Sequence, residues 1–344
     1  MTTNKRLPFA LLTATRLARA GLFLEATADI QRILRQPSAS DAAVDGRVSD
    51  AVLSTGVKGP PGDFIAGSHT NQAGTRPYKL YIPTGDARKA LPMVVMLHGC
   101  TQTPDDFAAG TGMNSLAEER QFFVLYPGQT PAANGSRCWN WFKRSDQHRD
   151  KGEPAIIAGM TREVMNRCRV DVGKVYVAGL SAGGAMAAVM GATYPDLYAA
   201  IGVHSGLAAG SAHDVPSAFA AMRGTPTSSP RGTVQAARAV PVIVFHGDRD
   251  TTVHRRNGEQ VILQSMGRNA ASSNIFSVEH GQVPGGHAYT RTIQADPTGR
   301  VIHEHWLVHG AGHAWSGGST RGSYTDPKGP DATRAMIRFF YQNA

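Results

Sequence analysis

Short apolar runs recur from residue 78 onward and are separated by segments in which apolar residues have helical spacing. Four runs are continuous, which is typical of strands buried on both faces of a sheet, namely residues 93–97, 122–126, 175–178 and 242–245. Residues 78–82 alternate between apolar and polar positions, as a half-buried strand does. Residues 303–308 predict a last strand near the C-terminus.

Helical patterns occupy intervals between these strands. They cover residues 107–120, 156–168, 182–194 and 331–341. Strands that alternate with helices indicate a largely parallel sheet with helices on both faces. We therefore predict one α/β domain over residues 76–344.

Residues 1–75 have a different composition and predict an N-terminal extension. Residues 1–36 combine apolar positions near helical spacing with several arginines, which favours an amphipathic, basic arm. Residues 37–75 are rich in Ser, Gly, Pro and Asp and predict an irregular linker. The arm faintly resembles a signal peptide, but Arg16 interrupts its apolar stretch. We expect a cytoplasmic protein, with secretion as the alternative, and no transmembrane segment.

Composition excludes some classes of protein. Hydrophobic residues make up 41% of the 344 residues and charged residues 18%, which is unlike a disordered chain. The net charge of +9 is compatible with nucleic-acid binding. However, Lys and Arg never occur in runs longer than a pair, and we recognise no zinc-finger or helix-turn-helix pattern. We expect no nucleic-acid partner and interpret the charge as a generally basic surface.

The chain has three cysteines, Cys100, Cys138 and Cys168, and an odd number cannot pair completely. One disulfide plus one thiol, or three thiols, are both compatible with the sequence. If a disulfide forms, Cys138 can pair with Cys100 or with Cys168. The cysteines lack the close spacing of metal ligands, so we expect neither a metal nor a cofactor.

The strongest chemical signal is the G-x-S-x-G pattern of residues 179–183, with Ser181 at its centre. An apolar strand precedes it directly and a helix rich in Ala and Met follows it. This context is the one that a nucleophilic serine requires, because a sharp turn between strand and helix projects the hydroxyl above the sheet. The helix N-terminus there also favours negative charge. We predict that Ser181 is a nucleophile.

A nucleophilic serine needs a base, and the base needs an acid that orients it. Asp250 follows the strand at 242–245 within an H-G-x-x-D pattern, where a carboxylate can reach an imidazole. We predict Asp250 as the acid. Asp248 is interpreted as a residue that shapes the turn or pairs with Arg249.

Four of the 13 histidines lie near the C-terminus, at positions 303, 305, 309 and 313. His313 lies in a loop of small residues between the last strand and the terminal helix, where the third member of a triad is expected. We predict His313 as the base and rank His309 second. His303 and His305 occupy alternating strand positions and are interpreted as structural.

Acyl transfer also needs backbone N–H groups that stabilise an oxyanion. The residue after the nucleophile, Ala182, should supply one of them. The loop after the strand at 93–97 should supply the other, and the N–H of Cys100 is our candidate there. His98 precedes the serine in the chain and is interpreted as a residue that shapes this loop.

Three segments together resemble the polyhydroxybutyrate depolymerase family of esterases, which also contains feruloyl and acetylxylan esterases. They are LHGCTQ at 97–102, CWNWF at 138–142 and GLSAGGAM at 179–186. The resemblance implies an α/β-hydrolase fold and a metal-free Ser181–His313–Asp250 triad. It also implies a substrate-binding wall formed by Trp139 or Trp141. Trp315 follows the predicted base His313 closely in the chain, so we expect it to line the same site.

The resemblance implies a serine esterase that cleaves polyhydroxyalkanoate-type polyester or its oligomers through an acyl-enzyme. A feruloyl or acetylxylan esterase is the alternative within the same chemistry. A non-catalytic protein that binds granules or other surfaces through its basic N-terminal arm is the alternative from another class. Weak association of the arm with granules is also compatible with the enzyme.

Overall fold

The computed structural model describes residues 61–86, 88–225, 240–266 and 275–344. In this part of the chain the main sheet has ten strands, in the order β1-β2-β4-β3-β5-β6-β7-β10-β9-β8. The strands are β1 (Asp63–Asn71), β2 (Gly74–Ile82), β3 (Leu91–Leu97), β4 (Phe123–Pro127), β5 (Val170–Leu180), β6 (Ala200–His204), β7 (Val242–Gly247), β8 (Ile275–Gln282), β9 (Ala288–Ala295) and β10 (Val301–Val308). The six central strands, in sheet order β4, β3, β5, β6, β7 and β10, are parallel. The antiparallel pair β1 and β2 lies on one side of them, and the antiparallel pair β9 and β8 lies on the other.

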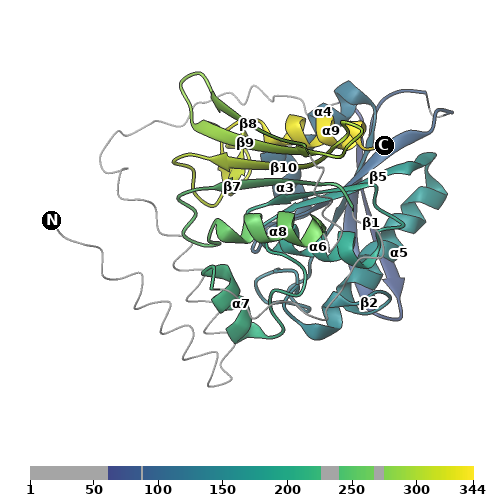
Figure 1. The fold of residues 1–344 in the computed structure, drawn as a ribbon. Coiled ribbons are helices and arrows are strands. Elements are labelled where there is room, and N and C mark those ends of the chain that lie inside the picture. The colour runs from purple at the N-terminus through teal and green to yellow at the C-terminus, as the bar shows by residue number, and fades with distance from the viewer. Residues whose placement is uncertain (1–60, 87, 226–239, 267–274) are drawn as a thin grey trace, which may run out of the picture. The chain divides into compact units, whose positions relative to one another are not determined.

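Helices cover both faces of the sheet (Figure 1). The described helices are α3 (Pro104–Thr111), α4 (Met113–Arg120), α5 (Gly152–Arg167), α6 (Ala182–Thr193), α7 (Val215–Met222), α8 (Arg256–Met266) and α9 (Ala332–Gln342). The core forms two clusters, one containing residues of α5, α6, α7 and α8 and the other containing residues of α3, α4 and α9. Alternate residues of β3 enter the two clusters, which is the period of two that a strand buried on both faces requires. This arrangement is the α/β-hydrolase fold that the sequence predicts.

The N-terminal boundary lies earlier than predicted. The sequence assigns residues 37–75 to an irregular linker, but β1 pairs along its whole length with β2, and the compact unit that contains the sheet begins at Gly62. The sequence did not predict β1, because it is an edge strand whose residues are all exposed or half-buried and therefore show no apolar pattern. The predicted amphipathic arm at residues 1–36 lies outside the described residues.

Two helices, α3 and α4, take the place of the single helix that the sequence predicts for residues 107–120. Residues 107–120 were expected to form a single helix, but Gly112 ends α3 with a left-handed φ of 64° and begins α4. Glycine adopts this conformation without steric cost, which is why the chain can turn there. Among the described residues, no helix combines the length and the apolar character that crossing a membrane requires.

A buried ion-pair network joins β9, β10 and α9. Glu304 on β10 has no exposed surface, and its carboxylate accepts hydrogen bonds from Arg291, Arg338 and the Nε1 of Trp306 at 2.7–3.1 Å. Burial raises the pKa of Glu304, but the two guanidinium groups outweigh it and the net pKa is lowered. The carboxylate is therefore ionised and fully paired at neutral pH.

We expect Glu304→Gln to lower the free energy of unfolding by about 3 kcal/mol, because it removes the charge that pairs two arginines. Urea denaturation measures this change. Glu279→Gln is the matched control, since Glu279 is an exposed partner of the same Arg291 and should contribute below about 1 kcal/mol. Equal effects of the two variants would contradict the prediction.

Candidate active site

Ser181 lies at a strained turn between β5 and α6. Its φ of 58° and ψ of −119° lie outside the regions that L-residues prefer, at a cost of about 1–3 kcal/mol. The turn is held because the Ser181 N–H donates to the carbonyl of His204 on β6 at 2.9 Å. A Cβ on Gly183 would overlap the carbonyl oxygen of Leu97, and a Cβ on Gly179 would overlap the carbonyl group of Gly183. The glycines are thus required by close backbone approach.

The order of the strands places three loops at one edge of the sheet. Strands β5, β6, β7 and β10 are consecutive and parallel, so their carboxyl ends lie together. Ser181 follows β5, Asp250 follows β7 and His313 follows β10. Open α/β sheets bind their ligands at this edge.

Asp250 and His313 form a hydrogen-bonded pair. The Asp250 Oδ2 lies 2.7 Å from the His313 Nδ1, and the exposed fractions of the two side chains are 0% and 10%. The other oxygen, Oδ1, accepts the N–H groups of Thr252 at 2.9 Å and Val253 at 2.8 Å. Burial raises the pKa of Asp250, but His313 in particular outweighs it and lowers the pKa to about 2. The carboxylate is therefore ionised and fixed in orientation.

His246 supports this carboxylate from within the core. Burial lowers the pKa of His246, so its ring is neutral. Its Nε2 lies 2.7 Å from the carbonyl of Val253 and 3.5 Å from the Asp250 Oδ2. The Nε2–H therefore donates to the carbonyl of the turn whose amides hold Asp250. Sequence reasoning gave His246 no role, although the H-G-x-x-D pattern contains it.

Asp248 and His309 form a second pair beside the first. The Asp248 Oδ2 lies 3.0 Å from the His309 Nδ1, and the Asp248 Oδ1 accepts the N–H of Gly310 at 2.7 Å. The His309 Nε2 lies 2.8 Å from the hydroxyl of Thr290 on β9. Both nitrogens of His309, the second-ranked base, are thus engaged.

The loop after β3 approaches Ser181. A Cβ on Gly99 would lie 3.6 Å from the Cβ of Ser181. The N–H of Gly99 donates to the Gln102 side chain at 2.9 Å, and that of Thr101 donates to the carbonyl of Ser136 at 2.7 Å. These contacts fix the backbone on both sides of Cys100, whose N–H is the candidate oxyanion donor. Ala182, the other candidate, is the first residue of α6.

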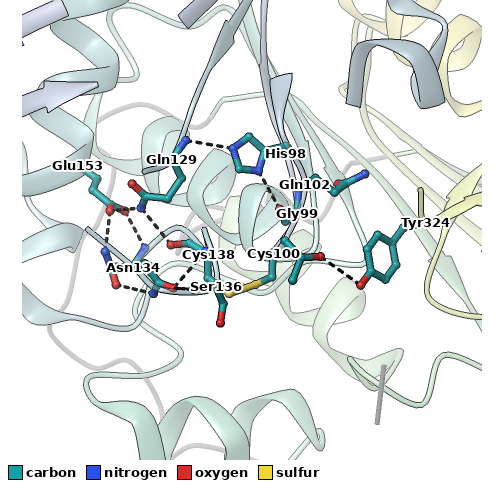
Figure 2. Close-up of a disulfide and its surroundings, with 12 residues drawn as sticks. His98, Gly99, Cys100, Gln102, Gln129, Asn134, Ser136, Cys138, Glu153 and Tyr324 are labelled. Atoms are coloured by element: carbon teal, nitrogen blue, oxygen red, sulfur yellow. Dashed lines mark hydrogen bonds between the residues drawn. A yellow bond between two sulfur atoms is a disulfide. The ribbon is translucent and has the colours of Figure 1, made fainter. Parts of the chain in front are cut away.

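A disulfide joins this loop to the segment 134–140. Cys100 pairs with Cys138, and Cys168 is a free thiol, which decides between the two pairings that the sequence left open. Within this segment the side-chain oxygen of Asn134 accepts the N–H groups of Ser136 at 3.0 Å and Cys138 at 3.3 Å (Figure 2). Burial, which the nearby charge of Asp146 reinforces, raises the pKa of Glu153.

Glu153 is a buried carboxylate that holds several groups of this region together, and the sequence did not predict this role. Its carboxylate accepts both the backbone N–H and the side-chain amide of Asn140 at 2.6 Å, and the amide of Gln129 at 2.5 Å. The N–H of Gln129 in turn donates to His98 at 3.1 Å (Figure 2). The sequence carried no signal of these contacts, because Glu153 precedes the helix predicted at residues 156–168 and its partners lie 13 and 24 residues earlier in the chain.

We expect Cys138→Ser to destabilise the protein by about 3–4 kcal/mol, the loop-closure estimate for its 38-residue separation. The rate on a soluble ester should also fall, because the loop that carries Cys100 loses its anchor. Thermal unfolding and initial rates measure the two effects. Cys168→Ser is the matched control and should change neither appreciably. A variant as active and as stable as the parent would contradict the prediction.

The tryptophans that were expected to line the substrate site are buried. Trp139 is 0% exposed, Trp315 1% and Trp141 6%. Trp315 packs on Phe107 and His204, and its Nε1 donates to the hydroxyl of Thr333 at 3.0 Å. The assignment of Trp139 and Trp315 to a substrate-binding wall is therefore corrected, because a side chain without exposed surface packs the core instead. Trp141 retains a small exposed fraction.

The sheet, its helices and the turn at Ser181 are those of the α/β-hydrolase fold. The family model for esterase PHB depolymerase matches residues 76–278, more than half of the chain, and the chain belongs to that family. Poly(3-hydroxyalkanoate) depolymerase C of Paucimonas lemoignei is 31% identical over 71% of this chain and 59% of that protein. Feruloyl esterase B of Neurospora crassa is 30% identical over 76% of this chain and 86% of that protein.

A solved structure supports the fold. Acetyl xylan esterase from Aspergillus awamori superposes with a TM-score of 0.60 at 21% identity, over 81% of this chain and 99% of that one. The chain spans less than two thirds of the length of the depolymerase and of several acetylxylan esterases that it matches. The match of the family model ends at residue 278, before His313.

Proposed function

We propose that this protein is a serine esterase that hydrolyses polyhydroxyalkanoate-type polyester or its oligomers. The observation that carries the proposal is the buried Asp250–His313 pair at 2.7 Å, at the sheet edge where the strained turn presents Ser181. Membership of the esterase PHB depolymerase family and the similarity to a poly(3-hydroxyalkanoate) depolymerase support the substrate class.

In the proposed mechanism the Nδ1–H of His313 donates to Asp250, which leaves the Nε2 as the base. His313 removes the proton of the Ser181 hydroxyl as its oxygen attacks the acyl carbon. The N–H groups of Cys100 and Ala182 stabilise the oxyanion, and His313 then protonates the leaving alcohol. Water, activated by the same imidazole, releases the acid from the acyl-enzyme. Asp250 stays ionised throughout, because its pKa is about 2.

A feruloyl or acetylxylan esterase is the second candidate, favoured by the feruloyl esterase that this chain covers over 86% of its length. A panel of substrates separates the candidates: a short p-nitrophenyl ester, hydroxybutyrate oligomers, amorphous polyhydroxybutyrate, acetylated xylan and methyl ferulate. Cleavage of the oligomers and the polymer is the expected result. Cleavage of ferulate or acetylxylan alone would reject the polyester assignment, and hydrolysis of none would reject the esterase.

Association with polyester granules through the basic N-terminal arm is a further part of the proposal. Deleting residues 1–36 should reduce adsorption to amorphous polyester and leave turnover of a soluble ester unchanged. If turnover is absent and adsorption is the main activity, the non-catalytic alternative is correct. A cytoplasmic location stays our proposal, with secretion as the alternative; the Cys100–Cys138 disulfide is the state expected under the alternative, because disulfides persist mainly in oxidising compartments.

A further inference from the structure

The loops that carry Asp250 and His313 also carry a second carboxylate–imidazole pair, Asp248 with His309, at 3.0 Å. The side chains of this second pair are 28% and 39% exposed, so they lie nearer the surface than the first pair. The pair is anchored on β9, because the His309 Nε2 contacts the hydroxyl of Thr290 at 2.8 Å. The mechanism proposed above uses neither residue.

Besides the Asp250–His313 bond, the two loops are joined by backbone hydrogen bonds and by the Asp248 carboxylate. The N–H of Asp248 donates to the carbonyl of Val308 at 3.0 Å, and that of Arg249 donates to the carbonyl of Ala311 at 3.0 Å. The Asp248 Oδ1 accepts the N–H of Gly310 at 2.7 Å. Gly310 has a left-handed φ of 82°, so this bond holds the turn that leads into the His313 segment.

Close packing explains why these contacts determine the position of His313. A Cβ on Gly247 would overlap the carbonyl oxygen of Ala311 and lie 2.7 Å from that of Gly312. The segment 309–313 therefore rests directly on the start of the acid loop. A shift at Gly310 moves the base relative to Asp250.

We propose that Asp248 is a positioning residue, which through Gly310 and His309 holds the segment 309–313 so that His313 meets both Asp250 and Ser181. This inference rests on the proposed function. Asp248 acts through hydrogen bonds to two groups of the base loop and has no contact with the reacting atoms. Its contribution therefore depends on the bonds that its side chain makes and not on its charge.

Asparagine at position 248 can keep both bonds. Its oxygen accepts the N–H of Gly310, and its amide N–H donates to the Nδ1 of His309. His309 then adopts the other tautomer and donates its Nε2–H to Thr290. Alanine at position 248 removes both bonds. Comparing the two variants therefore separates the effect of losing the hydrogen bonds from the effect of losing the negative charge at position 248.

The experiment compares Asp248→Ala, Asp248→Asn and Glu163→Gln on a soluble p-nitrophenyl ester, with thermal unfolding in parallel. For Asp248→Ala we expect kcat to fall by about 10–100-fold at unchanged KM, as misplacement of a catalytic group by about 1 Å does. Asp248→Asn should restore most of this loss. Glu163→Gln removes the charge of a half-buried pair with His69, at 2.6 Å and on other elements, and should leave kcat unchanged.

Unchanged kcat in Asp248→Ala would overturn the inference, and so would an Asp248→Asn variant as impaired as the alanine variant. If Asp248→Ala does not fold, His309→Ala removes one of the two bonds and should still lower kcat at unchanged KM. A third outcome concerns the proposed function. If Asp248→Asn is inactive while Asp250→Asn retains activity, Asp248 is the acid, and both the positioning role and the assignment of Asp250 are wrong.

Discussion

Ser181→Ala should lower kcat for a soluble ester by about a million-fold, as removal of the nucleophile does in serine hydrolases of known mechanism. The proposed mechanism has no other group that forms the acyl-enzyme. In this variant only the oxyanion donors and substrate binding would still accelerate the reaction. Alanine removes one oxygen atom and leaves the backbone of the turn able to form, because Gly179 and Gly183 provide the space. Initial rates and circular dichroism measure the two properties.

Ser205→Ala is the matched control for this variant. Ser205 follows β6, the neighbouring strand, and has a similar left-handed φ of 48°. It is buried, and its hydroxyl makes one long contact of 3.3 Å with His204. The control should retain activity within about tenfold, the cost of one lost hydrogen bond. If Ser181→Ala keeps substantial activity, the enzyme does not use Ser181 as its nucleophile.

Asp250→Asn should lower kcat by about 10⁴-fold, with little change in folding. The amide of asparagine would donate to the Nδ1 of His313 and impose the tautomer that carries its proton on Nε2. That nitrogen then cannot accept the proton of Ser181. The asparagine oxygen still accepts the N–H groups of Thr252 and Val253, so the turn persists.

The rate should be measured above pH 5, where the native carboxylate is ionised because its pKa is about 2. Asp248→Asn is the control, since its imidazole partner His309 can change tautomer without loss of a bond. Activity of Asp250→Asn close to that of the parent would show that the Asp250–His313 pair is not part of the reaction.

The strands that the sequence predicted as continuous apolar runs are buried on both faces. Strands β3, β4 and β7 and the second half of β5 are buried on both faces and appear as continuous apolar runs. Strand β8 was missed because all its residues but one are exposed, and exposed positions carry no apolar pattern. Strand β6 is fully buried but has only five residues, too few to distinguish a strand from a helix by periodicity.

The sequence by itself determined the strand-turn-helix context of Ser181, because close backbone approach requires glycine at positions 179 and 183 and this requirement is local. It also determined that buried strands alternate with helices in an α/β fold, since burial on both faces leaves a pattern along the chain. Tertiary structure decided which imidazole meets which carboxylate, which cysteine pairs with Cys138, and that Trp139 and Trp315 lie in the core. These outcomes depend on distances between residues far apart in the chain, and such distances are set only when the strands take their places in the sheet.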